Sequence, residues 1–187
     1  EITMTIDGNE ARRALADIHS ATEKSSALRG YAGAANYLIA WGAAWIVGGL
    51  AGLISPALSQ WGWTMAVAAA VVCSIVLGLR VQRAAGATAT LPKIILMTLM
   101  MALVCAAISV VLDLPSLREA FALQALIISG LYMGYGVWRG ARIFFLGFAL
   151  AAAVLVGWFC LRDQFELFVG VAGGALLVLT GFWLRNA

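Results

Sequence analysis

The fold of this chain is decided by residues 30–79, which read GYAGAANYLIAWGAAWIVGGLAGLISPALSQWGWTMAVAAAVVCSIVLGL. This stretch contains no Asp, Glu, Lys or Arg. At about 1.5 Å of helical rise per residue, it is far longer than one crossing of a bilayer about 30 Å thick requires. It must therefore fold back on itself, and the segment SPALSQ at 55–60 supplies the turn. We expect two transmembrane helices, over residues 31–54 and 61–79.

The overall composition agrees with a membrane protein. Hydrophobic residues make up 63% of the 187-residue chain and charged residues only 11%, whereas soluble domains carry about 25% charge. The mean hydropathy is +0.96. The net charge of +3 is too small to indicate a nucleic-acid partner. The lipid bilayer is therefore the expected surroundings of most of this protein.

Four more charge-free runs follow the first two spans, each just long enough to cross the hydrocarbon core. They cover residues 94–112, 120–138, 143–161 and 167–184. We therefore expect an all-α, polytopic six-helix transmembrane bundle. Its six helices form three hairpins, and the second arm of each hairpin ends with a glycine shortly before an arginine. A triplicated hairpin explains this pattern, as does chance similarity between apolar segments.

Two outer turns carry helix-capping patterns. Ser116 and Glu119 form an S-x-x-E capping box at the start of one span, and Asp163 and Glu166 have the same spacing before the last span. Capping and short ion pairs are thus the expected roles of the acidic residues in these turns.

The N-terminal segment, residues 1–29, is the only long polar part of the chain. Apolar residues recur there at helical spacing, at Ala11, Ala14, Leu15, Ile18 and Ala21. We predict a short cytoplasmic amphipathic helix, followed by a transmembrane domain over residues 30–187. Gly30 and Gly33 permit a change of direction between the two. The helix either covers the end of the bundle or docks a partner.

The distribution of basic residues predicts the orientation. Ten of the 12 Lys and Arg residues fall on the side of the N-terminal segment, and only Arg118 and Arg162 fall on the other. The positive-inside rule then places both termini in the cytoplasm of a bacterial inner membrane. We assign Trp61, Trp63 and Trp158 to the outer aromatic belt.

Small residues spaced four apart predict where helices approach one another closely. The longest ridge lies on the first span, and shorter ones lie on the fourth and sixth spans. The predicted helix-packing residues are Ala40, Ala44, Gly48, Gly52, Gly130, Gly134, Gly170 and Gly174.

The predicted spans contain no ionisable side chain of the kind that proton-coupled or ion-coupled transport requires. The only histidine, His19, lies in the polar N-terminal segment, so a haem held by two intramembrane histidines is excluded. No nucleophile and base stand at a catalytic spacing. We therefore predict no catalytic residues, no metal site and no cofactor, and we expect a protein that is not an enzyme.

Mildly polar and aromatic residues within the spans allow a second interpretation. They hydrogen-bond between helices, or they line a cavity for an uncharged or amphipathic ligand. Gln124 is the sharpest candidate, because it lies inside a span and needs a partner. The predicted cavity residues are Trp41, Trp45, Gln124, Tyr132 and Tyr135.

Two functions follow from these patterns. The first is an accessory, regulatory or scaffold subunit that acts through helix–helix contacts, as a homo-oligomer or with a membrane-complex partner. The alternative is a permease or sensor for a small neutral or amphipathic ligand. A continuous polar-lined cavity containing Gln124 favours the ligand; a closed core with exposed glycine ridges favours assembly.

Three segments carry a resemblance to a known group of proteins. LRGYAGA at 28–34, WGAAW at 41–45 and GWFCLRD at 157–163 resemble uncharacterised six-helix integral membrane proteins of proteobacteria. A fainter similarity, to the HdeD acid-resistance membrane proteins, involves the six-helix plan and residues 48–56 followed by Gly78. These resemblances imply the fold and supply no catalytic residues.

Overall fold

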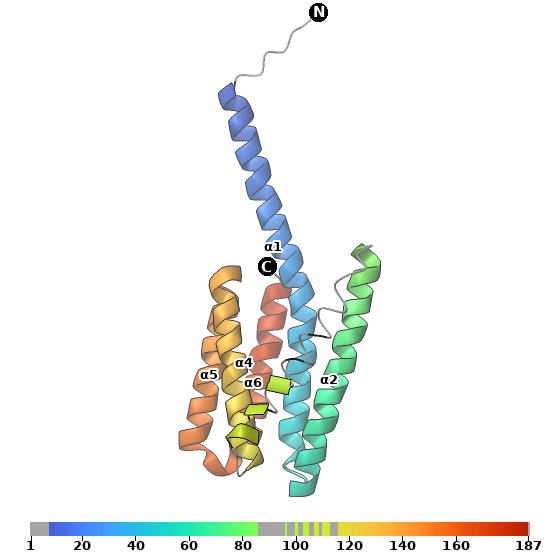
Figure 1. The fold of residues 1–187 in the computed structure, drawn as a ribbon, viewed down its shortest axis with the longest axis vertical. Coiled ribbons are helices and arrows are strands. Elements are labelled where there is room, and N and C mark those ends of the chain that lie inside the picture. The colour runs from blue at the N-terminus through green and yellow to red at the C-terminus, as the bar shows by residue number, and fades with distance from the viewer. Residues whose placement is uncertain are drawn as a thin grey trace, which may run out of the picture.

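In a computed structural model the chain is a bundle of long helices (Figure 1). The structure describes residues 8–85 and 116–186, together with positions 96, 100, 103, 104, 107, 108 and 110–112. Within the two long described ranges, the elements are α1 (Gly8–Ala51), α2 (Pro56–Ala85), α4 (Leu117–Arg139), α5 (Ala141–Cys160), the 3₁₀ turn η1 (Arg162–Gln164) and α6 (Phe165–Arg185). The parts of the chain so described contain no β-strand. The predicted all-α fold is confirmed.

Five of these helices are long and apolar enough to cross a membrane. The spans are Ala34–Ala51, Trp61–Arg80, Arg118–Trp138, Ala141–Cys160 and Arg162–Arg185. The chain is therefore a multi-pass membrane protein, as the hydropathy predicts. The remaining predicted span, residues 94–112, falls mostly outside the described residues.

Helix α1 is 44 residues long and continues without a break through the expected boundary near Gly30. The absence of proline between Gly8 and Ser55 explains this continuity, because an interior glycine costs a helix only about 1 kcal/mol while proline costs about 3. Residues 8–33, which we call the arm, project about 39 Å at helical rise. The arm extends past the bundle instead of covering its end (Figure 1).

The two ends of the bundle differ in what they hold (Figure 1). The arm leaves from one end, where the α4–α5 turn and the C-terminus also lie. The opposite end, which we call the distal end, holds the α1–α2 turn, the start of α4 and η1.

Helix α1 occupies the centre of the bundle, between α2 and α6 (Figure 1). Its interface with α6 is the most extensive one, followed by that of α4 with α5. Helix α5 also packs on α6. The closest pairings therefore join different predicted hairpins, and the triplicated hairpin stays a prediction.

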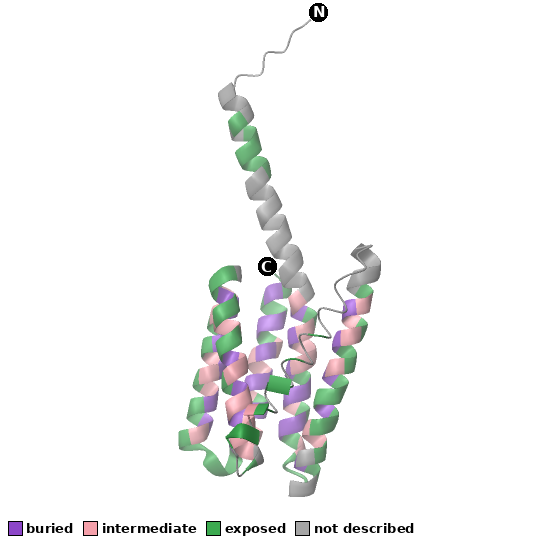
Figure 2. Ribbon diagram, in the orientation of Figure 1, coloured by how far each residue is buried: buried purple, intermediate pink, exposed green. Residues whose placement is uncertain are grey.

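The core lies where α1, α4, α5 and α6 meet, and many of the residues on the outer faces are exposed (Figure 2). Leu150, Val154, Phe165 and Val169 are each at most 1% exposed. The exposed side chains are largely apolar, among them Leu103, Val137 and Leu179. An apolar surface of this kind suits a bilayer, because lipid chains are as apolar as the core.

A single glycine makes the tight turn between α4 and α5. Gly140 has φ of 129°, a conformation that side chains with a Cβ rarely adopt. The two helices then pack closely, because a Cβ built at Gly147 would lie 2.6 Å from both the Met133 nitrogen and the Ser129 oxygen.

Candidate functional site

The predicted ridge on α1 lies against α2. Ala44 and Gly48 are buried, Ala40 is half-buried and Gly52 is exposed. A Cβ built at Gly48 would lie 2.7 Å from the Trp63 ring of α2. The middle of the ridge, at Gly48, therefore packs closely against α2 of the same chain.

A second line of small residues on α1 faces α6, and the sequence interpretation missed it. A Cβ built at Gly170 would lie 2.7 Å from Gly49 Cα, and one at Gly174 would lie 2.5 Å from the Gly42 carbonyl oxygen. The backbones of the two helices thus touch directly at two places. Ala35, Gly42 and Gly49 recur every seventh residue, and this spacing was the available signal.

The two predicted ridge glycines of α4 have a different environment. Gly130 and Gly134 are exposed, and no atom of the described residues would lie within 4 Å of a Cβ built at either position. Helix α4 meets α5 through another face, which includes Ser129 and Gly136. The Gly130–Gly134 face is thus left without a neighbour from the part of the chain that the structure describes.

Five aromatic side chains form a connected cluster, one from each of the five spans. We call Trp45, Trp63, Phe121, Trp158 and Phe165 the ring cluster. The centroids of contacting rings lie 4.4 to 6.4 Å apart, and three of the five contacts are edge-on, at 75°, 77° and 90°. Such tilted and edge-on geometries are favourable for aromatic pairs. The cluster ties all five spans together.

The ring cluster changes the role of two predicted belt residues. Trp63 and Trp158 are only partly exposed and pack inward, whereas Trp61 remains 69% exposed. Belt position and core position cannot be separated by sequence here, because both require an aromatic residue near the end of a span.

The predicted cavity residues are placed in different surroundings. Trp45 is 5% exposed and belongs to the ring cluster. Trp41 Nε1 donates a hydrogen bond of 3.1 Å to Ser74 Oγ on α2. Tyr132 packs against the core, while Tyr135 is 51% exposed. Gln124 is half-buried.

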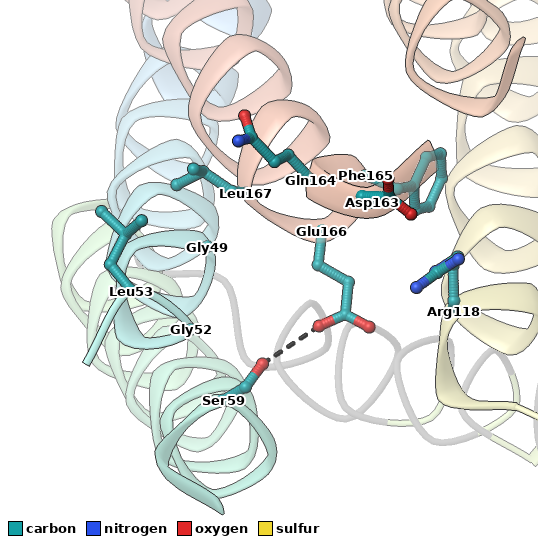
Figure 3. A pocket seen from close by; sticks show the side chains of 10 residues that line it. All are labelled: Gly49, Gly52, Leu53, Ser59, Arg118, Asp163, Gln164, Phe165, Glu166 and Leu167. Carbon is teal, nitrogen blue, oxygen red and sulfur yellow. Dashed lines mark hydrogen bonds between the residues drawn. The ribbon is translucent and has the colours of Figure 1, made fainter. Parts of the chain in front are cut away.

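The distal end of the bundle contains a pocket of about 360 Å³ (Figure 3). None of the predicted cavity residues lines it. Its walls come from the end of α1 and the turn after it, the start of α2, the start of α4, η1 and the start of α6. The lining residues are Gly49, Gly52, Leu53, Ser59, Arg118, Asp163, Gln164, Phe165, Glu166 and Leu167.

Glu166 has an unexpected partner in this pocket. The Ser59 hydroxyl, on a residue 8% exposed, donates a 3.0 Å hydrogen bond to Glu166 Oε2 (Figure 3). Helix α6 has no side-chain cap, so the capping role predicted for Asp163 and Glu166 is wrong. The carboxylate instead joins α6 to α2, 107 residues away in sequence.

Of the two hydrogen bonds of the capping box at the start of α4, the structure has the one that the serine side chain accepts. Ser116 Oγ accepts a hydrogen bond of 3.3 Å from the backbone N–H of Glu119. This contact orients the first turn of α4, and with it Arg118, which lines the distal pocket.

Comparison with known proteins adds no family to this geometry. No family model, no curated protein and no solved structure matches the chain. The resemblance to six-helix membrane proteins of proteobacteria therefore stays a prediction. Over the residues that the structure covers, no three His, Cys, Asp or Glu side chains come together as metal ligands.

Proposed function

We propose that this protein is a non-enzymatic subunit of a membrane assembly, acting through helix–helix contacts. The observation that carries the proposal is the ring cluster. Trp45, expected to line a ligand cavity, packs at 5% exposure against Trp63 and Phe121. The space between the spans at this level is thus occupied by side chains, which favours a contact function over a ligand channel.

The exposed face of α4 supports the same proposal. Gly130 and Gly134 form a G-x-x-x-G motif in a transmembrane helix, the pattern that permits close helix association. At a position that only meets lipid, glycine has no packing advantage, and it is about 0.8 to 1 kcal/mol less favourable than alanine in a helix interior. We infer that another helix packs here.

The arm offers a second surface for contacts outside the bilayer. Leu15 and Ile18, three residues apart on its helix, are 66% and 62% exposed. We propose that the arm lies in the bacterial cytoplasm and that the distal end faces the other side of the inner membrane.

Reporter fusions test this orientation. We expect enzymatic reporters fused after Gln60 and Asp163 to be active outside the cytoplasm, and those fused after Gly140 and Asn186 to be active inside. The reason is the excess of Lys and Arg at the arm end. Activity in the reverse pattern would overturn the orientation.

Substitution of Gly134 tests the assembly. We expect Gly134→Leu to lower the fraction of assembled protein in nanodiscs by about tenfold, because overpacking a close interface costs about 1 to 3 kcal/mol. Native mass spectrometry and single-molecule photobleaching count the chains and any co-purified subunit. Val72→Leu, on α2 at a position 60% exposed and away from the Gly130–Gly134 face, is the control and should leave assembly unchanged.

The melting temperature of the monomer identifies the neighbour. An unchanged melting temperature with lost assembly places the contact on another chain. A lowered melting temperature places it on the same chain, where the predicted span over 94–112 is available. Equal assembly and equal stability of both variants would mean that the glycines face lipid, and the assembly proposal would fail at this surface.

A further inference from the structure

The distal pocket lies at the boundary between hydrocarbon and water. The apolar spans begin at Trp61, Arg118 and Arg162 and end at Ala51, and the pocket residues sit at or just beyond these limits. Leu53, at its edge, is 66% exposed. A molecule in this pocket would therefore place polar groups among the helix ends while an apolar part remains in the bilayer.

The pocket holds separated charges of both signs. Arg118 enters from α4, whereas Asp163 and Glu166 enter from η1 and α6 (Figure 3). Within the part of the chain that the structure describes, Arg118 forms no ion pair with either carboxylate. Arg118 and Glu166 are nonetheless only partly exposed. Charged groups withdrawn from water are costly unless a partner compensates them.

The carboxylate of Glu166 is held in place for such a partner. One oxygen accepts the 3.0 Å hydrogen bond from Ser59, and the other points toward the Arg118 side of the pocket (Figure 3). The volume of about 360 Å³ is within the range of about 300 to 1,000 Å³ for small-molecule sites.

From this geometry we propose that the distal pocket binds a zwitterion in which a primary ammonium stands beside a phosphate, as in a phosphoethanolamine headgroup. The ammonium donates hydrogen bonds to Glu166 and Asp163. The phosphate pairs with Arg118, whose planar guanidinium matches phosphate oxygens in a bidentate manner. This inference is independent of the proposed assembly function.

Lipid retention measured by native mass spectrometry tests the site. The protein is released from nanodiscs containing equal amounts of phosphatidylethanolamine, phosphatidylcholine and phosphatidylglycerol. We expect about tenfold preferential retention of phosphatidylethanolamine. The quaternary ammonium of phosphatidylcholine donates no hydrogen bond, and phosphatidylglycerol carries no cation. Equal retention of all three lipids by the wild-type protein would overturn the proposal.

Two variants remove one charge each. We expect Arg118→Gln and Glu166→Gln to abolish the preference. Glu166→Gln keeps a carbonyl oxygen that accepts the Ser59 hydrogen bond, so the fold is preserved. If the melting temperature of Glu166→Gln nevertheless falls, the lipid preference is measured in Arg118→Gln and in Asp163→Asn, where Asp163 is exposed. An unchanged preference in Arg118→Gln would overturn the proposal.

Matched controls lie at the same end of the bundle. Arg162→Gln removes an exposed arginine that stacks over the Trp158 ring at 5.5 Å and does not line the pocket. Glu119→Gln removes a neighbouring carboxylate that also lies outside it. Both should retain the lipid preference, and its loss in either control would count against this pocket.

Soluble phosphoethanolamine separates the two sources of the ligand chemistry. Displacement of bound lipid at millimolar concentration would show that the pocket recognises the headgroup alone. Failure to displace a preferentially retained lipid would show that the acyl chains contribute and that the source is the bilayer.

Discussion

Replacing Gly174 with alanine is expected to lower the free energy of unfolding of the bundle by about 2 kcal/mol. The added Cβ would lie 2.5 Å from the Gly42 carbonyl oxygen and 2.7 Å from Ile46 Cγ1. Backbone of the adjacent helix cannot move aside locally, so the clash falls in the upper part of the 1 to 3 kcal/mol typical of overpacking. The gain in helix propensity, about 1 kcal/mol, offsets only part of it. Gly174→Leu should prevent α1 and α6 from pairing at all.

Steric-trapping or denaturant titration in bicelles measures this effect, with Gly52→Ala as the matched control. A Cβ at Gly52 would lie 3.4 Å from Ser59 Oγ, which is ordinary van der Waals contact. Gly52→Ala should therefore be neutral or slightly stabilising. If Gly174→Ala were as well tolerated as Gly52→Ala, the direct backbone contact between α1 and α6 would be contradicted.

The spans themselves were predictable from hydropathy to within a few residues. The sequence predicted crossings over 61–79 and 120–138, and the structure has Trp61–Arg80 and Arg118–Trp138. This success has a simple physical cause. In lipid every backbone polar group must be hydrogen-bonded within the protein, as in a helix or a closed barrel, and a charge-free apolar run of about 20 residues has the length of a spanning helix and not of a barrel strand.

The pairing of helix faces was only half predictable. Small residues indicated that something approaches α1 closely, but not which helix. The ridge at Ala44 and Gly48 meets α2, whereas the unrecognised line at Gly42 and Gly49 meets α6. A soluble helix would reveal its buried face by apolar periodicity. Here all faces are apolar, and that signal is lost.

The distal pocket was not predictable from local sequence. Asp163 and Glu166 have the spacing of a capping box, and the local pattern gives no reason to look further. The hydrogen bond from Ser59 to Glu166 joins residues 107 positions apart and depends on how α2 and α6 are placed by α1. Long-range placement of this kind follows from packing, which the sequence specifies only indirectly.

Truncating Trp45 to alanine is expected to destabilise the bundle by about 3 to 5 kcal/mol, the cost typical of large aromatic deletions in a core. Trp45 is 5% exposed, and the centroid of its ring lies 6.4 Å from that of Trp63 and 5.7 Å from that of Phe121. Its removal breaks the ring contacts of α1 with α2 and α4. Lipid cannot fill the resulting cavity as it fills a gap at the surface, so the loss of dispersion contacts is not recovered.

Tryptophan truncation at the surface provides the comparison. Trp138 is 88% exposed, so Trp138→Ala should change the free energy of unfolding by no more than about 0.5 kcal/mol. Trp45→Phe keeps a ring in the cluster, so its loss in the free energy of unfolding should lie between those of Trp45→Ala and Trp138→Ala. Unfolding monitored by circular dichroism in bicelles measures all three variants against the wild type.

Because the ring cluster joins five spans, we also expect Trp45→Ala to broaden the unfolding transition, as α4 separates from α1 before α1 separates from α6. Equal stability of Trp45→Ala and Trp138→Ala would mean that the ring cluster does not hold the spans together, and a cavity at that level would then have to be considered again.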